Sequence, residues 1–192
     1  MKNVFSAIDK YYKLSDSSKK LIIDKLEPFT LKKGEILIHD LEKNPYLYFI
    51  EKGAVKTHYF NEEGSKKVVW FGFEGSICFS LSSYMNIDTD FINDSIELIE
   101  DCEFYRVKIS YIKSLFKNHC DWANWGRSFI ENTFVITIKE MNENKARSTK
   151  ENYLNLIKNT PYINERVALK DIASYLGVSP VTLSRLRSEI EK

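Results

Sequence analysis

The stretch Leu169–Arg187 reads LKDIASYLGVSPVTLSRLR, a pattern that predicts two short helices joined by a tight turn. Ile172 and Leu176 form one apolar stripe at helical spacing. Gly177 ends this first helix, because glycine tolerates the left-handed conformation that a tight turn needs. Ala173 is small where two crossing helices come closest, so we expect the first helix to pack against the second.

The second helix has its own start signal and its own buried face. Ser179 stands at the N-cap, and Pro180 follows at the first helical position, where its missing N–H costs no hydrogen bond. The apolar stripe consists of Leu183, Leu186 and Ile190. Such spacing is typical of the helix-turn-helix that reads DNA, and an αα-hairpin that only packs is the alternative.

The outer face of the second helix supplies the candidates for DNA contact. Arg185 is the strongest base-reading candidate, because its guanidinium can bond guanine O6 and N7 together. Val181 suits a thymine methyl group. Thr182 and Ser184 are expected to meet phosphates or to cap the helix locally. The set is completed by Ser179 and Pro180 at the start of the helix and by Lys170 and Arg187, both assigned to phosphates.

Charge is unevenly distributed along the chain, which has 192 residues and a net charge of +1. Residues 144–192 carry nine Lys/Arg against five Asp/Glu, whereas the rest carries nineteen against twenty-two. The basic end coincides with the proposed DNA reader, as contact with a phosphate backbone requires. A hydrophobic content of 43% is enough for a substantial core.

The cysteines and the apolar segments indicate the compartment. Cys78, Cys102 and Cys120 are odd in number, far apart and without a CxxC pair, which argues against a disulfide framework. The sequence has neither a cationic, apolar N-terminal signal nor an apolar run of transmembrane length. We therefore expect a soluble, cytoplasmic protein without a membrane partner.

The sequence period changes along the first 107 residues. Residues 1–28 have helical patterning that Pro28 ends, and residues from Phe29 to about Val107 alternate as strand faces do, with glycines between the runs. This string of short strands predicts an all-β sandwich or barrel. The polar residues 82–94 are expected to form a loop.

A long helix is predicted from Asp121, as its cap, to about Asn144. Its apolar residues fall on two faces, so one face can cover the β domain and the other can meet a second copy of the chain. We assign dimerisation to Trp122, Trp125, Phe129 and Ile136. The second face carries Ile130, Phe134, Ile138 and Met141, and a core helix in a monomer is the alternative.

The order of these elements resembles the Crp/Fnr family of bacterial transcription regulators. The resemblance rests on Leu31–Leu37, Tyr48–Lys56, Glu100–Phe104 and, most specifically, Ile172–Arg187. It implies an α+β fold with an N-terminal double-stranded β-helix, a jelly-roll-like β-roll with flanking helices, in residues 1–120. A long dimerisation helix over 121–144 and an all-α helix-turn-helix domain over 145–192 would follow. In a departure from many family members, we expect no C-terminal wing after the second helix of the motif. The resemblance also implies a homodimer on double-stranded DNA, with RNA polymerase as a further candidate partner.

Departures from the family pattern concern the effector. Members that bind cyclic nucleotides carry a Gly-Glu pair for the ribose and an Arg-Ser pair for the phosphate, but here Ser76 follows Gly75, and Ile92 and Asn93 stand at the second pair. A partly buried phosphate needs a cation or several donors, so cyclic AMP is not expected to bind in the usual mode. A ligand between the roll and the long helix would have these candidates: Gly75, Ser76, Cys78, Ser80, Asn93 and Arg127.

Cofactors and catalysis find little support in the residues. No cysteine precedes Cys78, so the family's N-terminal iron–sulfur ligation is not expected, although Cys78 itself is a candidate for a redox role. His39 and His58 are single, without a His-x-His pair, so neither a metal site nor a catalytic residue is predicted. The alternatives to a DNA-binding regulator are a β-roll ligand-binding or protein-interaction module and, less favoured, a cupin-like enzyme.

Overall fold

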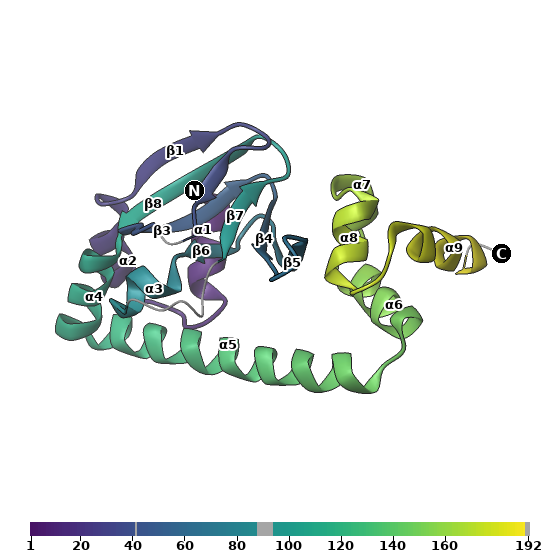
Figure 1. Ribbon diagram of the computed structural model, residues 1–192. Helices are drawn as coiled ribbons and strands as arrows, with labels where there is room; N and C mark the ends of the chain where they lie inside the picture. Colours follow the sequence, from purple (N-terminus) through teal and green to yellow (C-terminus); the bar gives the residue numbers. More distant parts are fainter. Residues whose placement is uncertain (41, 88–93, 191–192) are drawn as a thin grey trace.

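The protein is a β-roll joined by one long helix to a cluster of short helices, as the computed structural model of residues 1–40, 42–87 and 94–190 shows (Figure 1). The strands are β1 (Glu27–Leu31), β2 (Ile36–Ile38), β3 (Tyr46–Lys52), β4 (Val55–Phe60), β5 (Lys66–Gly72), β6 (Ile77–Phe79), β7 (Ser95–Leu98) and β8 (Cys102–Lys108). The helices are α1 (Lys2–Asp9), α2 (Asp16–Ile23), α3 (Leu81–Met85), α4 (Ile109–Asn118), α5 (Cys120–Ala146), α6 (Thr149–Asn159), α7 (Ile163–Arg166), α8 (Leu169–Tyr175) and α9 (Pro180–Ile190).

Two antiparallel sheets form the roll, with strand orders β1-β8-β3-β6 and β2-β7-β4-β5. Their inner faces share a core that includes Tyr48, Ile50, Val55, Leu98 and Phe104. The α+β fold with a β-roll is therefore confirmed. Pro28 does not follow a helix directly, as its position suggested: it lies inside β1, opposite Tyr105, at the sheet edge where a missing N–H is tolerated.

The turn between β3 and β4 depends on Gly53. Its φ angle is +107°, and a Cβ atom there would lie 2.5 Å from Cys102 Sγ and 2.8 Å from the carbonyl oxygen of Asp101. Only glycine fits this close approach of two chain segments without a shift of the backbone. The turn thus fixes how β4 leaves the first sheet and enters the second.

The N-terminal half of helix α5 packs against α1 and α2. The indole N–H groups of Trp122 and Trp125 donate to the carbonyl oxygens of Ser18 (3.0 Å) and Ile8 (2.8 Å), and both rings are buried. The side chain of Asp121 does not act as a helix cap; it accepts hydrogen bonds from Ser15 and Ser18 and so ties α2 to α5.

The face of α5 that we assigned to dimerisation therefore packs largely within the chain. Trp122 and Trp125 cover the N-terminal helices, and Phe129, half-buried, stacks on Trp125 with ring centroids 5.4 Å apart. Ile136 is exposed but lies toward the roll, beside a cavity. The other large apolar residues that are exposed on α5 are Ile130, Phe134, Val135, Ile138 and Met141.

The C-terminal helices form as their caps predict. Ser148 caps α6 through a reciprocal capping box with Glu151, and Ser179 accepts a hydrogen bond from Thr182 N–H at the start of α9. Gly177 has a φ angle of +70° in the turn between α8 and α9. Residues 81–85, placed in a loop by their polar character, form the short helix α3, which Ser80 caps.

Candidate functional site

The outer face of α9 is open to solvent, and the helix points away from the roll (Figure 1). Leu183 is fully buried and anchors α9 against α8, whereas Val181 is 60% exposed on the opposite side. Ser179 and Thr182 bond each other through their hydroxyl groups at 2.9 Å, so both belong to the cap. The other predicted contact residues that are exposed are Pro180, Ser184, Arg185 and Lys170, while Arg187 is half-buried.

Helix α8 lies along the free edge of strand β5, which has no other strand beside it in its sheet. The Ser174 hydroxyl accepts from the Val68 N–H at 3.0 Å and donates to the Lys66 carbonyl at 3.2 Å. One side chain thus satisfies two groups of an unpaired strand edge, as a neighbouring strand would. The first helix of the motif is thereby fixed to the roll.

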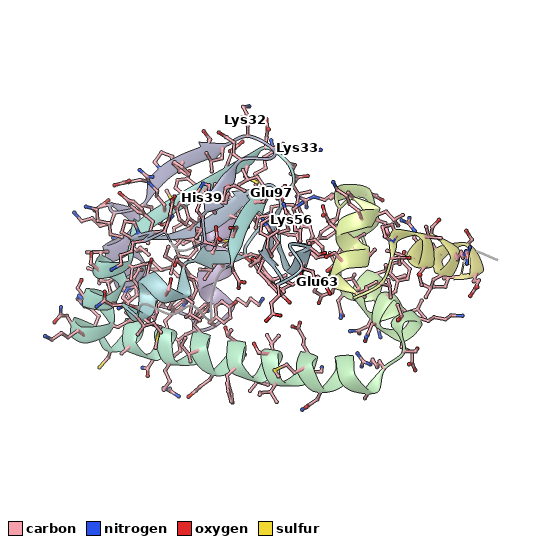
Figure 2. All side chains as sticks on the ribbon, viewed as in Figure 1. Lys32, Lys33, His39, Lys56, Glu63 and Glu97 are labelled. Atoms are coloured by element: carbon pink, nitrogen blue, oxygen red, sulfur yellow. The ribbon has the colours of Figure 1, made fainter. Side chains whose placement is uncertain are left out.

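A buried ion cluster crosses the same contact. Lys56 Nζ lies 2.9 Å from Asp171 Oδ2 of α8 and 3.2 Å from Glu97 Oε1 of β7, and Lys66 Nζ lies 2.6 Å from Glu97 Oε2. Figure 2 shows Lys56 and Glu97 together in the part of the roll that faces α8. Burial raises the pKa of Glu97, but its hydrogen bond from Lys66 and the charge of Lys56 outweigh this effect and lower it.

Arg166 makes a second set of charged contacts between the helices and the roll. Its guanidinium bonds both carboxylate oxygens of Glu74 at 2.8 and 2.9 Å and also bonds Glu100. It lies over the rings of Phe73 and Tyr162 at 5.2 and 5.4 Å. The hydrogen bonds that the guanidinium donates to Glu74 raise its pKa further above the ordinary value.

The apolar core also continues across this contact. Ala54, Phe73 and Ile99 of the roll pack in one cluster with Ile172 and Leu183 of the helix-turn-helix. Sequence reasoning missed this interface entirely. The sequence did contain a signal for it, because Lys56 follows two apolar residues in a predicted strand. A lysine that is buried in a strand needs a carboxylate close by.

A cavity of about 490 Å³ lies between the roll and α5. Four of the predicted effector residues, Gly75, Ser76, Cys78 and Ser80, line it. Arg127 does not: it is exposed on α5 and pairs with Glu131 at 3.1 Å, one helical turn away. Asn93 lies outside the described residues.

The polar groups of the predicted cassette are already used by the fold. Ser80 Oγ accepts from Ser83 N–H at 3.2 Å, and Ser76 Oγ accepts from Phe73 N–H at 3.1 Å. Cys78 is buried, and burial raises the pKa of its thiol far above the ordinary value. A protonated thiol out of reach of solvent does not suit a redox role.

Aromatic side chains form part of the cavity wall. Phe71 and Phe79 line the cavity, whereas Phe73 packs against Tyr162 and Trp125 belongs to the core. Further aromatic residues at the cavity are Tyr11, Trp70 and Phe129. Within residues 1–40, 42–87 and 94–190, no group of three or more His, Cys, Asp or Glu could hold a metal ion, and no helix is long and apolar enough to cross a membrane.

Comparison with known proteins agrees with this geometry. Residues 28–119 match the sequence model of the cyclic nucleotide-binding domain family. No curated protein sequence matches the chain. Among solved structures, a protein described as a Crp/Fnr family transcriptional regulator from Eubacterium rectale has a TM-score of 0.69 at 20% identity, over 93% of this chain and 84% of that chain.

Two further solved structures have the same fold. FixK2 from Bradyrhizobium japonicum gives a TM-score of 0.70 at 18% identity, over 86% of this chain and 84% of that chain. The c-di-GMP responsive global regulator CLP of Xanthomonas campestris gives 0.68 at 11% identity, over 92% of each chain. At these identities the likeness establishes the fold: a β-roll followed by a long helix and a helix-turn-helix.

Proposed function

We propose that this chain, with a cyclic nucleotide-binding domain at residues 28–119 and the fold of Crp/Fnr regulators, is a sequence-specific DNA-binding transcriptional regulator. The observation that carries the proposal is the exposed face of α9 beside a buried Leu183. One side of this helix is packed against the protein, and the other side is exposed near the capped N-terminus. This is the form of a helix that enters the major groove of DNA. Action on DNA implies a cytoplasmic location, and RNA polymerase is a further proposed partner.

The proposed regulator is a homodimer that associates through the exposed face of α5. Phe134 is 66% exposed and Ile138 is 43% exposed, in the stretch of α5 beyond the buried Trp122 and Trp125, where residues 131–142 are all exposed. Ridges of apolar side chains on a long helix associate with a second copy by interlocking. The proposal therefore moves dimerisation from Trp122 and Trp125 to Ile130, Phe134, Ile138 and Met141.

The effector site in this proposal is the cavity between the roll and α5, and cyclic AMP does not occupy it in the usual mode. Among the described residues that line the cavity, the only Lys or Arg is Lys10, whereas three residues are acidic: Asp40, Asp94 and Glu140. A cyclic phosphate there would meet more negative than positive charge.

Binding-site selection from random duplexes, followed by gel-shift assays, tests DNA recognition. The full chain is expected to enrich a two-fold symmetric sequence with half-sites one helical turn apart. Absence of any enriched sequence, with the chain folded, would contradict the proposal. Sedimentation equilibrium tests the dimer, and calorimetric titration with cyclic AMP is expected to give no heat beyond dilution.

A protein-interaction module and an enzyme are the competing functions. The solved structures of similar fold named above are regulators, which supports a non-enzymatic role. The proposed regulator has no resident cofactor. A module that binds no DNA would leave the exposed face of α9 without a partner, so the selection experiment separates the two.

A further inference from the structure

We propose that the cavity between the roll and α5 takes an amphipathic organic cation, an amine carried on an aromatic body. This inference rests on the proposed role of the cavity as the effector site of a regulator. Three observations carry it: the carboxylates at one end of the cavity, the presence of a single Lys or Arg, Lys10, among the described residues that line it, and its aromatic wall. Each is independent of the family pattern.

The acid end of the cavity is formed where β2 ends and β7 begins. Asp40 follows β2 and Asp94 precedes β7, and the two strand ends adjoin because Ile38 pairs with Ile96. Asp40 is held in place by Ser95, whose hydroxyl accepts from the Asp40 N–H at 3.1 Å and donates to its carboxylate at 3.3 Å. Both acids therefore line the same wall.

Asp94 has no hydrogen bond or ion pair with any of the described residues. Its side chain is half-buried, and burial raises the pKa of the carboxyl group. A half-buried carboxylate without a donor has lost part of its hydration, and an ammonium group placed beside it would stabilise its charged form. Among the described residues, the site thus lacks a hydrogen-bond donor for the Asp94 carboxylate, and a bound amine would supply one.

Cations are scarce around the cavity. Lys10, the lysine at its edge, is exposed, and its Nζ atom lies over the Tyr11 ring, 5.5 Å from the centroid. Residues 79–101, which connect β6 to β8, contain six Asp or Glu and neither Lys nor Arg. Of these acids, Glu97, Glu100 and Asp101 are paired with Lys or Arg side chains, whereas Asp94 at the cavity pairs with none of the described residues. An amine beside Asp94 would therefore be attracted and an anion repelled.

The remaining wall suits an aromatic body. Phe79 and Phe129 lie with ring centroids 6.2 Å apart, and Tyr11 meets Phe129 edge-on at 4.9 Å. Trp70 is 37% exposed although it lines the cavity, so part of its surface is free to stack on a ligand. Aromatic faces attract both flat apolar rings and organic cations. The volume of about 490 Å³ is in the range of small-molecule sites.

Calorimetric titration of the full chain with three indoles tests the proposal. Tryptamine, tryptophol and indole-3-acetate place a cation, a neutral hydroxyl and an anion on the same ring system. Near neutral pH, tryptamine is expected to bind roughly tenfold or more tightly than tryptophol, because a hydrogen bond to a charged group is stronger than a neutral one. Indole-3-acetate is expected to bind most weakly.

Two variants locate the partner of the amine. Asp94→Asn is expected to remove the preference for tryptamine over tryptophol, with a melting curve to check that the variant folds. Glu63→Gln is the matched control, because Glu63 lies in the turn between β4 and β5, well apart from His39 at the cavity (Figure 2). It is expected to keep the full preference.

The possible outcomes separate this inference from the proposed function. Equal binding of the three indoles by the wild type, tighter binding of indole-3-acetate, or no binding of tryptamine would each overturn the amine assignment. A preference that persists in Asp94→Asn would overturn the role of Asp94. DNA selection without any ligand is a separate readout, so its failure contradicts the regulator proposal whatever the indoles do.

Discussion

The Nζ atom of Lys56, on strand β4, lies 2.9 Å from the Oδ2 atom of Asp171, on the first helix of the helix-turn-helix. Both side chains are almost fully buried, at 7% and 11% exposure, although 115 residues separate them in sequence. The pair, together with Glu97, joins the roll to the helix-turn-helix through charge as well as through apolar packing.

Asp171→Ala is expected to lower the free energy of unfolding by about 3–5 kcal/mol, because it leaves a buried ammonium with half of its partners. Urea unfolding measures the loss. The matched control is Glu103→Ala, which breaks the exposed pair with Lys52 (3.8 Å) and should cost less than about 1 kcal/mol. Equal losses in the two variants would mean that α8 is not docked on the roll in solution.

Acid is expected to destabilise the same contact in two steps. Burial and then the charge of Lys66 lower the pKa of His58 from its ordinary 6.5, and the pKa of Glu97 is lowered from 4.5. In both cases the unfolded chain binds more protons, so stability falls as pH drops, first below the ordinary histidine value and again as pH falls through the lowered value of Glu97.

The urea midpoint measured from neutral pH down to the acid range follows this decline. His58→Gln is expected to remove the first step and leave the second. A midpoint that stays constant down to the ordinary pKa of a carboxyl group, 4.5, would contradict the assignment to His58.

The sequence predicts features that depend on neighbouring residues better than features that depend on contacts between distant segments. The cap at Ser179 and the turn at Gly177 are local signals, and the structure confirms them. The alternating strands likewise predict the roll, because period two follows directly from strand geometry. Pro28 misled, since proline ends a helix and also suits an edge strand.

Features that depend on contacts between distant segments were not predictable. Two apolar faces on α5 were evident, but which face meets α1 and α2 depends on carbonyl groups at Ile8 and Ser18 that only the fold brings near the tryptophans. The docking of α8 on β5 depends on Ser174 and Lys56, whose partners are more than 100 residues away. The spacing of residues along the sequence does not reveal which distant residues form such pairs.

Dimerisation is expected to respond to the face of α5 that the structure leaves bare. Phe134→Glu places a charge on a side chain that is 66% exposed, so the chain should stay folded but become a monomer. Trp125→Ala should instead lower stability by about 3–5 kcal/mol, because it empties a core position. Sedimentation velocity and thermal melts on both variants separate the effects; a dimer that survives Phe134→Glu would contradict the assignment.

Thiol reactivity is expected to distinguish the three cysteines. Cys120 is exposed, whereas Cys78 and Cys102 are buried, and burial raises the pKa of Cys102 to about 12. A thiol reagent at neutral pH should therefore modify one cysteine per chain quickly and the other two only after urea is added. Mass spectrometry of the digested chain identifies the site. Rapid modification of Cys78 in the folded chain would revive a redox role for it.

Sequence preference is expected to depend on Arg185 more than on any lysine of the reader. Arg185 is exposed on α9 beside Val181, where its two-pronged donor can meet a guanine edge. Arg185→Ala should then cost about 1–3 kcal/mol on the preferred duplex and relax discrimination at one base pair.

Lys170→Ala should weaken binding about equally on all sequences and reduce the slope of affinity against salt by about 1, as loss of one phosphate contact does. Gel-shift titrations on the selected duplex and on single-base variants, at several salt concentrations, measure both quantities. If Arg185→Ala weakens every duplex alike, then Arg185 clamps a phosphate, and the base-reading role passes to Val181 and its neighbours at the start of α9.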